Sequence, residues 1–201
     1  MFDARIQTQL RPALNTIARG MVKFGFTANS VSIFGFLMGL AAAFAIGSQQ
    51  YLWGAVLIGI SRLCDGLDGA VARATQPTDF GGFLDISLDF LFYAAIPLAF
   101  AYANPAANAL SAATLLLAFM GTGSGFLAFA VIAEKRKMQS TDYPDKSFYF
   151  LGGLTEATET VTIFVAMCLW PNHFSTLAYS FAALCGITIV LRLVWGYKSF
   201  R

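Results

Sequence analysis

Residues 65–73 read Asp65-Gly66-Leu67-Asp68-Gly69-Ala70-Val71-Ala72-Arg73, and residues 81–89 read Gly81-Gly82-Phe83-Leu84-Asp85-Ile86-Ser87-Leu88-Asp89. The two stretches place four aspartates close together in a chain that is otherwise strongly apolar. An ionisable residue within a membrane segment is costly and therefore points to a functional site. Neighbouring carboxylates repel one another unless a cation neutralises them, and oxygen ligands suit Mg²⁺ or Mn²⁺. The pattern predicts a membrane enzyme that uses a divalent metal on a phosphate ester.

The composition places the chain among membrane proteins. It has 201 residues, of which 57% are hydrophobic and 12% are charged, and its mean hydropathy is +0.65. Soluble domains carry about 25% charged residues, so the composition favours a membrane protein over a soluble domain. Its three cysteines have no CxxC spacing, which argues against a zinc site or a disulfide framework. No nucleic-acid partner is expected.

Six apolar segments are long enough to cross a bilayer, a distance that takes about 20 helical residues. They are residues 29–47, 51–73, 79–103, 107–133, 147–170 and 174–197. Residues 1–26 instead repeat apolar positions at helical spacing among Arg and Gln, which predicts an interfacial amphipathic helix, kinked or restarted at Pro12. The expected fold is an all-α integral membrane protein, with an interfacial helix over 1–26 and a six-helix membrane domain over 27–201.

The basic residues predict the orientation. All 13 Lys and Arg residues fall on one side of this topology. The loops of the other side, near 48–50, 104–108 and 171–173, contain no Lys, Arg, Asp or Glu. Because basic residues concentrate on the cytoplasmic side, both termini and the aspartates are expected to face the cytoplasm. In a bacterium the location would be the cytoplasmic, or inner, membrane.

Helical spacing also predicts how the aspartates meet. Asp68 follows Asp65 by three positions, and Asp89 follows Asp85 by four, so each pair shares one face of its helix. The connection between the two helices is short, so they should be antiparallel neighbours. The two carboxylate pairs are therefore expected to converge near one membrane surface, where a metal could bind a diphosphate.

The spacing resembles the signature of the CDP-alcohol phosphatidyltransferase family, DxxDGxxAR followed by GxxxDxxxD. All eight marked positions are present, namely Asp65, Asp68, Gly69, Ala72, Arg73, Gly81, Asp85 and Asp89. Seven residues separate Arg73 from Gly81, one fewer than in many members. The start of the first segment is also similar to relatives, with Ala28 in place of a frequent proline.

The resemblance implies a reaction and a set of site residues. A phosphatidyl group would move from a CDP-linked lipid, such as CDP-diacylglycerol, to a small polar alcohol, with release of CMP. One or two ions of Mg²⁺ or Mn²⁺ would be held by Asp65, Asp68, Asp85 and Asp89. Asp89 would be the catalytic base for the acceptor hydroxyl. Cytidine diphosphate would be bound by Asn29, Asp65, Asp68, Gly69, Ala72, Arg73 and Gly81. As a basic residue on the cytoplasmic side, Arg73 also fits a simple membrane anchor.

The residues that recognise the acceptor alcohol are less constrained by the signature. Glu156 and Glu159 share a helix face near Thr155, and this pattern fits either an acceptor pocket or hydrogen bonds between helices. Three basic residues are candidates to bind an acceptor phosphate, namely Arg136, Lys146 and Arg192. Each also fits a cytoplasmic anchor. Glycerol 3-phosphate, an inositol phosphate and serine all suit the signature, and the basic residues favour glycerol 3-phosphate.

Two other functions use membrane carboxylates. A UbiA-type prenyltransferase also binds a diphosphate through aspartates and Mg²⁺, but it is longer and lacks the Gly-x-x-Ala-Arg continuation. A cation transporter would carry its polar groups near the bilayer midplane rather than at one face.

The expected partners are membrane lipids and a second copy of the chain. A homodimer is expected because the resembled family is commonly dimeric. Small residues at Gly35 and Gly39, and at Gly121 and Gly125, would allow close helix packing.

Overall fold

The computed structural model describes residues 2–137 and 155–201, and all regular elements in these ranges are helical. The helices are α1 (Phe2–Lys23), α2 (Ala28–Gly47), α3 (Tyr51–Ala74), α4 (Asp79–Ala103), α5 (Pro105–Lys135), α6 (Ala157–Leu169) and α7 (Phe174–Phe200). A short 3-10 turn, η1 (Pro171–His173), joins α6 to α7. The predicted all-α membrane architecture is confirmed.

The helices follow the predicted segments closely. Four of them, α2, α4, α5 and α7 together with η1, are long and apolar enough to cross a bilayer. Helix α3 has 24 residues, and its charged side chains lower its hydropathy. Helix α6 has 13 residues, and positions 147–154 of the expected fifth segment lie outside the described residues. A helix therefore corresponds to each predicted segment in the described part of the chain, four of them qualify as membrane spans, and the count of six spans stays a prediction.

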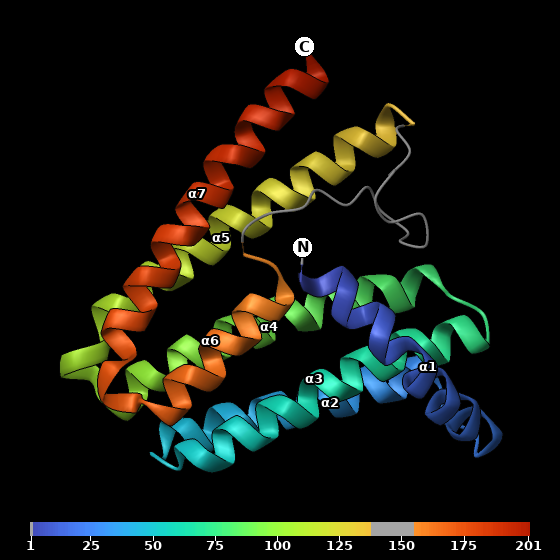
Figure 1. Cartoon of the computed structure of the whole chain (residues 1–201), viewed down its shortest axis with the longest axis horizontal. Coiled ribbons are helices and arrows are strands. Elements are labelled where there is room, and N and C mark those ends of the chain that lie inside the picture. Colours follow the sequence, from blue (N-terminus) through green and yellow to red (C-terminus); the bar gives the residue numbers. More distant parts are fainter. Residues whose placement is uncertain (1, 138–154) are drawn as a thin grey trace.

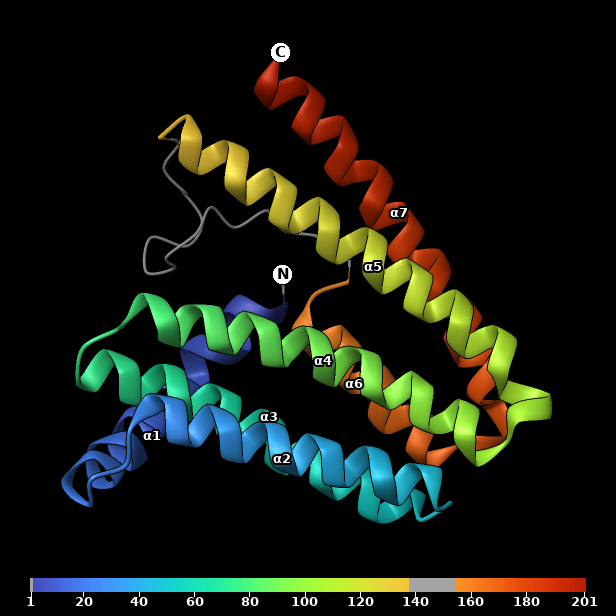
Figure 2. The same ribbon diagram turned by 180° about the vertical axis from the view of Figure 1, so that it is seen from behind.

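The connections between helices lie at two ends of the molecule (Figures 1 and 2). The α2–α3, α4–α5 and α6–α7 connections lie at one end, and these are the loops without Lys, Arg, Asp or Glu. The α3–α4 turn and the start of α2 lie at the other end, close to α1. This arrangement agrees with a two-sided topology, and the orientation toward the cytoplasm stays a prediction.

Helices α2 and α3 approach closely because α2 carries glycine at their contact. A Cβ atom built on Gly35 would lie 2.8 Å from the Cys64 Cβ and 3.3 Å from the Ser61 carbonyl oxygen. One turn later, a Cβ on Gly39 would meet the Phe92 ring of α4 and the Ser61 hydroxyl. Asp65 follows Cys64 directly, so this close contact fixes the part of α3 that carries the first aspartate.

Replacing Gly35 with alanine is expected to destabilise the protein. The new methyl group would overlap the Cys64 Cβ, and this atom cannot move unless the α3 backbone moves with it. Overpacking of this kind typically lowers the free energy of unfolding by about 1–3 kcal/mol. The matched control is Gly59→Ala on α3, because a Cβ there meets nothing within 4 Å and alanine favours the helix. Thermal unfolding in detergent compares the two variants. Equal stability of Gly35→Ala and the natural protein would contradict this packing argument.

The N-terminal helix α1 packs on α3. Ala18 of α1 is buried against Ala70 and Val71 of α3, and Leu14 and Met21 pack around them. Helix α1 contains Pro12 and continues through it as a single helix, so it does not restart there. The apolar side of this amphipathic helix is therefore partly covered by the segment of α3 that carries the aspartates.

The main hydrophobic core is shared by helices α2 to α7, and its largest aromatic side chains come from α4, α6 and α7. Phe92, Phe100, Phe164 and Phe174 are all fully buried, and the stacked rings of Phe100 and Phe174 are 4.5 Å apart. Glycines of α5 serve the same packing, because Cβ atoms on Gly121 and Gly123 would overlap Ile189 of α7 and Phe90 of α4. Three of the four glycines expected to favour a dimer, Gly35, Gly39 and Gly121, thus serve contacts within one chain.

Candidate active site

The short turn between α3 and α4 brings the two acidic stretches together. Residues 75–78 connect the helices, and the Thr78 hydroxyl accepts a hydrogen bond from the Gly81 N–H at 3.1 Å. This bond satisfies one of the N–H groups that a helix leaves open at its start. Helix α4 therefore begins close to the end of α3 and runs back toward the other end of the molecule. The two helices are not the directly packed neighbours that the sequence predicted, because both pack on α2, and only their longer side chains meet, among them the aspartates.

Asp65, Asp85 and Asp89 form a candidate metal cluster. One carboxylate oxygen of each residue lies within 4.8 Å of those of the other two. Oxygen ligands stand about 2.1 Å from Mg²⁺, so two ligands of one ion lie up to about 4.2 Å apart. The cluster is close to this spacing, and carboxylates are the hard donors that Mg²⁺ and Mn²⁺ prefer. The residues present therefore fit a divalent ion of this class.

The fourth predicted ligand, Asp68, lies beside the cluster. It is 6% exposed and lines the same pocket as the other three aspartates, together with Ser32 of α2. It is not among the three residues whose oxygens come within 4.8 Å of one another. The structure thus brings three of the four predicted ligands together and places Asp68 as their buried neighbour.

Arg62 also belongs to this pocket, whereas the sequence alone identifies it only as one of the basic residues of the predicted cytoplasmic side. Its Nη1 donates to Asp89 Oδ1 at 2.6 Å and to Asp65 Oδ1 at 3.3 Å. The signal that could have identified it is its spacing, because Arg62 lies three residues before Asp65 and therefore on the same helix face. It neutralises part of the negative charge that three carboxylates concentrate here.

The candidate nucleotide-binding residues lie at the same end of α3 and α4. A Cβ on Gly69 would lie 3.3 Å from Arg73 Nη1, so the exposed Arg73 side chain folds back over Gly69. A Cβ on Gly81 would lie 3.2 Å from Asn29 Oδ1, which places Asn29 of α2 against the start of α4. Ala72 precedes Arg73 and is partly exposed. The structure thus gathers these candidates next to the aspartates.

The predicted acceptor residues of α6 make contacts that start the helix. Glu156 is the N-cap residue, its side chain accepts from the Glu159 N–H, and the Glu159 carboxylate accepts from the Glu156 N–H at 3.1 Å. The Thr155 hydroxyl donates to the Thr188 hydroxyl of α7 at 3.0 Å. Both carboxylates therefore have a structural role, which is one of the two possibilities that the sequence left open.

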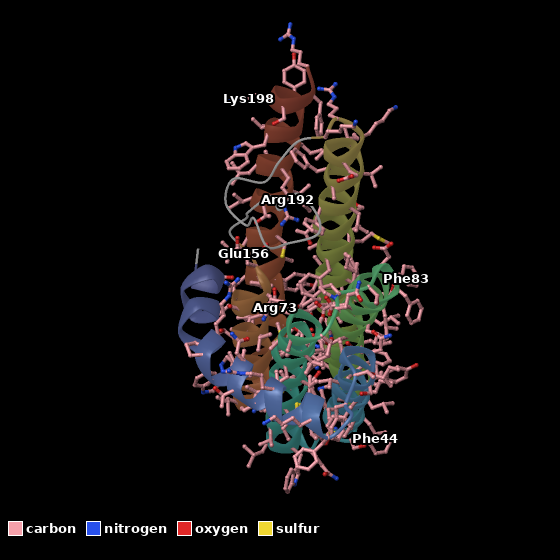
Figure 3. All side chains as sticks on the ribbon, turned by 90° about the vertical axis from the view of Figure 1, so that its right-hand side faces the viewer. Phe44, Arg73, Phe83, Glu156, Arg192 and Lys198 are labelled. Carbon is pink, nitrogen blue, oxygen red and sulfur yellow. The ribbon has the colours of Figure 1, made fainter. Side chains whose placement is uncertain are left out.

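The basic candidates for the acceptor phosphate are separated in space. Arg192 of α7 donates to the Thr122 carbonyl at 2.7 Å and lies close enough to Glu156 for their charges to interact. Both side chains are labelled in Figure 3. Arg136 instead donates to the carbonyl oxygens of Ser199 and Phe200, at the far end of α7. Lys146 lies outside the described residues. Arg192 and Glu156 are thus the pair that the structure brings together.

The chain matches the family model of CDP-alcohol phosphatidyltransferases over residues 26–194. It belongs to this family. The match includes both acidic stretches, so the resemblance read from the signature is confirmed, and with it the enzyme class. The prenyltransferase and transporter alternatives lose their support.

Relatives and solved structures agree with this assignment. Inner membrane protein YnjF of Escherichia coli is 46% identical over 201 residues, which cover 100% of this chain and 98% of the relative. An archaetidylinositol phosphate synthase of Pyrococcus horikoshii is 27% identical over 83% of this chain and 90% of its own. The phosphatidylinositol phosphate synthase PgsA1 of Mycobacterium tuberculosis, solved with CDP-DAG bound, superposes with a TM-score of 0.74 at 23% identity, over 92% of this chain and 93% of that chain. The same synthase was also solved with manganese and citrate, and that structure gives a TM-score of 0.73 at 23% identity, over 92% of this chain and 88% of that chain.

Proposed function

We propose that this phosphatidyltransferase moves the phosphatidyl group of CDP-diacylglycerol, or of a closely related CDP-lipid, to a phosphorylated small alcohol and releases CMP. The observation that carries the proposal is the convergence of Asp65 of α3 with Asp85 and Asp89 of α4 at one end of the molecule. A carboxylate cluster of this kind suits a diphosphate that is bound through Mg²⁺ or Mn²⁺. Its place beside the α3–α4 turn would let the lipid tails remain in the bilayer.

The chain's own residues divide the work of the transfer. When bound, Mg²⁺ or Mn²⁺ would stabilise the negative charge that develops on the departing CMP. Arg73, folded over Gly69, would bind a phosphate of the nucleotide through its planar guanidinium. Asp89 would take the proton of the acceptor hydroxyl while that oxygen bonds to the phosphatidyl phosphorus and the P–O bond to CMP breaks. Because Arg62 binds Asp89 Oδ1, Oδ2 is the oxygen left for this proton.

For the acceptor we propose an alcohol that carries a phosphate. Arg192 supports this, because it is a partly buried cation next to the start of α6. Two relatives are synthases of archaetidylinositol phosphate and of phosphatidylinositol phosphate, each 27% identical to this chain. Inositol phosphate and glycerol 3-phosphate are thus the first acceptors to compare. Glu156 and Thr155 would bind hydroxyl groups of the same molecule.

The orientation and assembly follow as further parts of the proposal. The active site and both termini would face the cytoplasm, because the basic residues fall on the side of the predicted membrane topology that carries the aspartates. The YnjF relative is named as an inner membrane protein, which supports the same membrane for this chain if it is bacterial. A homodimer would place two such sites in one assembly.

A donor and acceptor panel tests the proposed function. Purified protein in detergent receives CDP-diacylglycerol, Mn²⁺ and one of three acceptors, namely glycerol 3-phosphate, inositol phosphate or serine. CMP release and a new phosphodiester lipid, identified by mass, are expected with a phosphate-bearing acceptor. Turnover with serine in preference to both phosphorylated alcohols would contradict the proposed acceptor class. Absence of CMP with all acceptors would contradict the function itself.

Glu156→Gln is expected to weaken acceptor binding while leaving the CDP-lipid unaffected. The amide oxygen can still cap α6, but a charge-assisted hydrogen bond worth about 1.5–3 kcal/mol would be lost. The acceptor KM should therefore rise by about tenfold or more, with an unchanged CDP-lipid KM. Glu134→Gln at the exposed end of α5 is the matched control. Steady-state kinetics with each substrate varied in turn decide between this role and capping alone, which would alter both KM values equally or neither.

A further inference from the structure

Arg62 lies inside the acidic cluster but outside the family signature, which begins at Asp65. Its side chain is 14% exposed, so the charged group is enclosed by protein. Its Nη1 contacts Asp89 and Asp65, and its Nη2 donates to the Ser61 hydroxyl at 3.2 Å. These contacts place a permanent positive charge directly beside two of the three candidate metal ligands.

The guanidinium is also held by packing that does not depend on the carboxylates. Its central carbon lies 3.9 Å from the centre of the Phe92 ring and 5.8 Å from that of Tyr93. Phe92 is fully buried in the core of α4, so it offers a rigid face for the cation. Within the described part of the chain, the buried Nε has no hydrogen-bond partner. Arg62 is therefore held in the cluster by the aromatic rings of α4 as well as by the aspartates.

We propose that Arg62 is the positioning residue of Asp89, and that its charge lowers the affinity of the cluster for the divalent ion. The inference rests on the proposed function, in which Asp89 is the base. A charge-assisted hydrogen bond at 2.6 Å fixes one oxygen of Asp89 and so directs the other toward the acceptor. The same guanidinium repels a cation that approaches Asp65 and Asp89, since like charges at such distances interact strongly in a partly buried site.

The proposal gives two effects of opposite sign. Neutral partners that orient metal ligands usually strengthen metal binding, and their loss weakens binding and turnover together. Loss of Arg62 would instead remove a competing cation and leave three carboxylates to repel one another. The cluster should then bind a divalent ion more tightly, while Asp89 loses its orientation and turnover falls. General damage to the fold would instead lower both the affinity for the divalent ion and the turnover.

Calorimetric titration with Mn²⁺ alone tests the charge effect in the full-length protein in detergent. Arg62→Met, which keeps side-chain length but loses the charge, is expected to bind Mn²⁺ about tenfold more tightly than the natural protein. Arg62→Lys keeps the charge and should bind Mn²⁺ like the natural protein. Arg19→Met is the control for net charge, because Arg19 is exposed on α1, where it donates to Asn15 of its own helix. Its Mn²⁺ affinity should not change.

CMP release at saturating Mn²⁺ tests the positioning effect. The kcat of Arg62→Met should fall by about 10–100-fold, with partial recovery in Arg62→Lys. Unchanged or weaker Mn²⁺ binding by Arg62→Met, or an undiminished kcat, would overturn the proposal. The titration needs no CDP-lipid, so it decides about the charge of Arg62 even if the natural protein releases no CMP. Absence of CMP release by the natural protein would count against the proposed function alone.

Discussion

Chelation of divalent ions is expected to abolish CMP release, and added Mg²⁺ or Mn²⁺ is expected to restore it. The reason is the charge at the α3–α4 end, where Asp65, Asp85 and Asp89 place oxygen atoms within 4.8 Å of one another. A diphosphate cannot approach these carboxylates until a cation lies between them. Assays with excess EDTA, followed by readdition of each metal, measure the effect. Full activity in excess chelator would rule out the metal cluster as the basis of the reaction.

Single substitutions test whether the metal dependence of CMP release arises from the aspartate cluster. Asp65→Asn and Asp85→Asn should weaken binding of both Mn²⁺ and the CDP-lipid, in addition to turnover. Asp79→Asn is the matched control, because Asp79 lies in the first turn of the same helix α4 but outside the cluster. It should keep its metal affinity. Equal losses in the cluster and control variants would indicate an effect on the fold or on net charge.

Asp89→Asn is expected to lower kcat by about 10²–10⁴-fold, the usual contribution of a positioned general base. Asparagine still accepts the hydrogen bond from Arg62, so the local packing should survive. Because Asp89 is also a candidate metal ligand, binding of the CDP-lipid is compared at saturating Mn²⁺, where it should be retained better than in Asp68→Asn. Steady-state kinetics with direct measurement of CDP-lipid binding separate the two variants. Near-normal turnover of Asp89→Asn would remove this residue from the role of base.

The fold was largely predictable because it depends on local sequence. Apolar runs of about 20 residues, separated by Gly, Pro and Asn, predict helices whatever their neighbours are. The meeting of Asp65 with Asp85 and Asp89 followed from helical spacing and a short turn. The charge pattern of the loops predicted the two ends of the molecule, which the arrangement of connections in Figures 1 and 2 matches.

The partners of individual side chains could not be predicted in the same way. Arg136 binds the end of α7, 63 and 64 residues away in sequence, and spacing along one helix carries no information about such a contact. Glu156 and Glu159 presented the same uncertainty, because a carboxylate at a helix start suits both a cap and a ligand. The position of Arg62 within the cluster depends on Phe92, a residue of another helix.

The two candidate halves of the site come from different parts of the chain. The metal cluster and the nucleotide candidates belong to α2, α3 and α4, whereas Glu156 and Arg192 belong to α6 and α7. If Glu156 and Arg192 bind the acceptor as proposed, an enzyme given the C-terminal helices of a relative would use a different alcohol and the same lipid donor. A single ancestral scaffold could in this way give rise to enzymes for many headgroups. The glycine contacts that fix α2 against α3 would be the part of the scaffold that such divergence preserves.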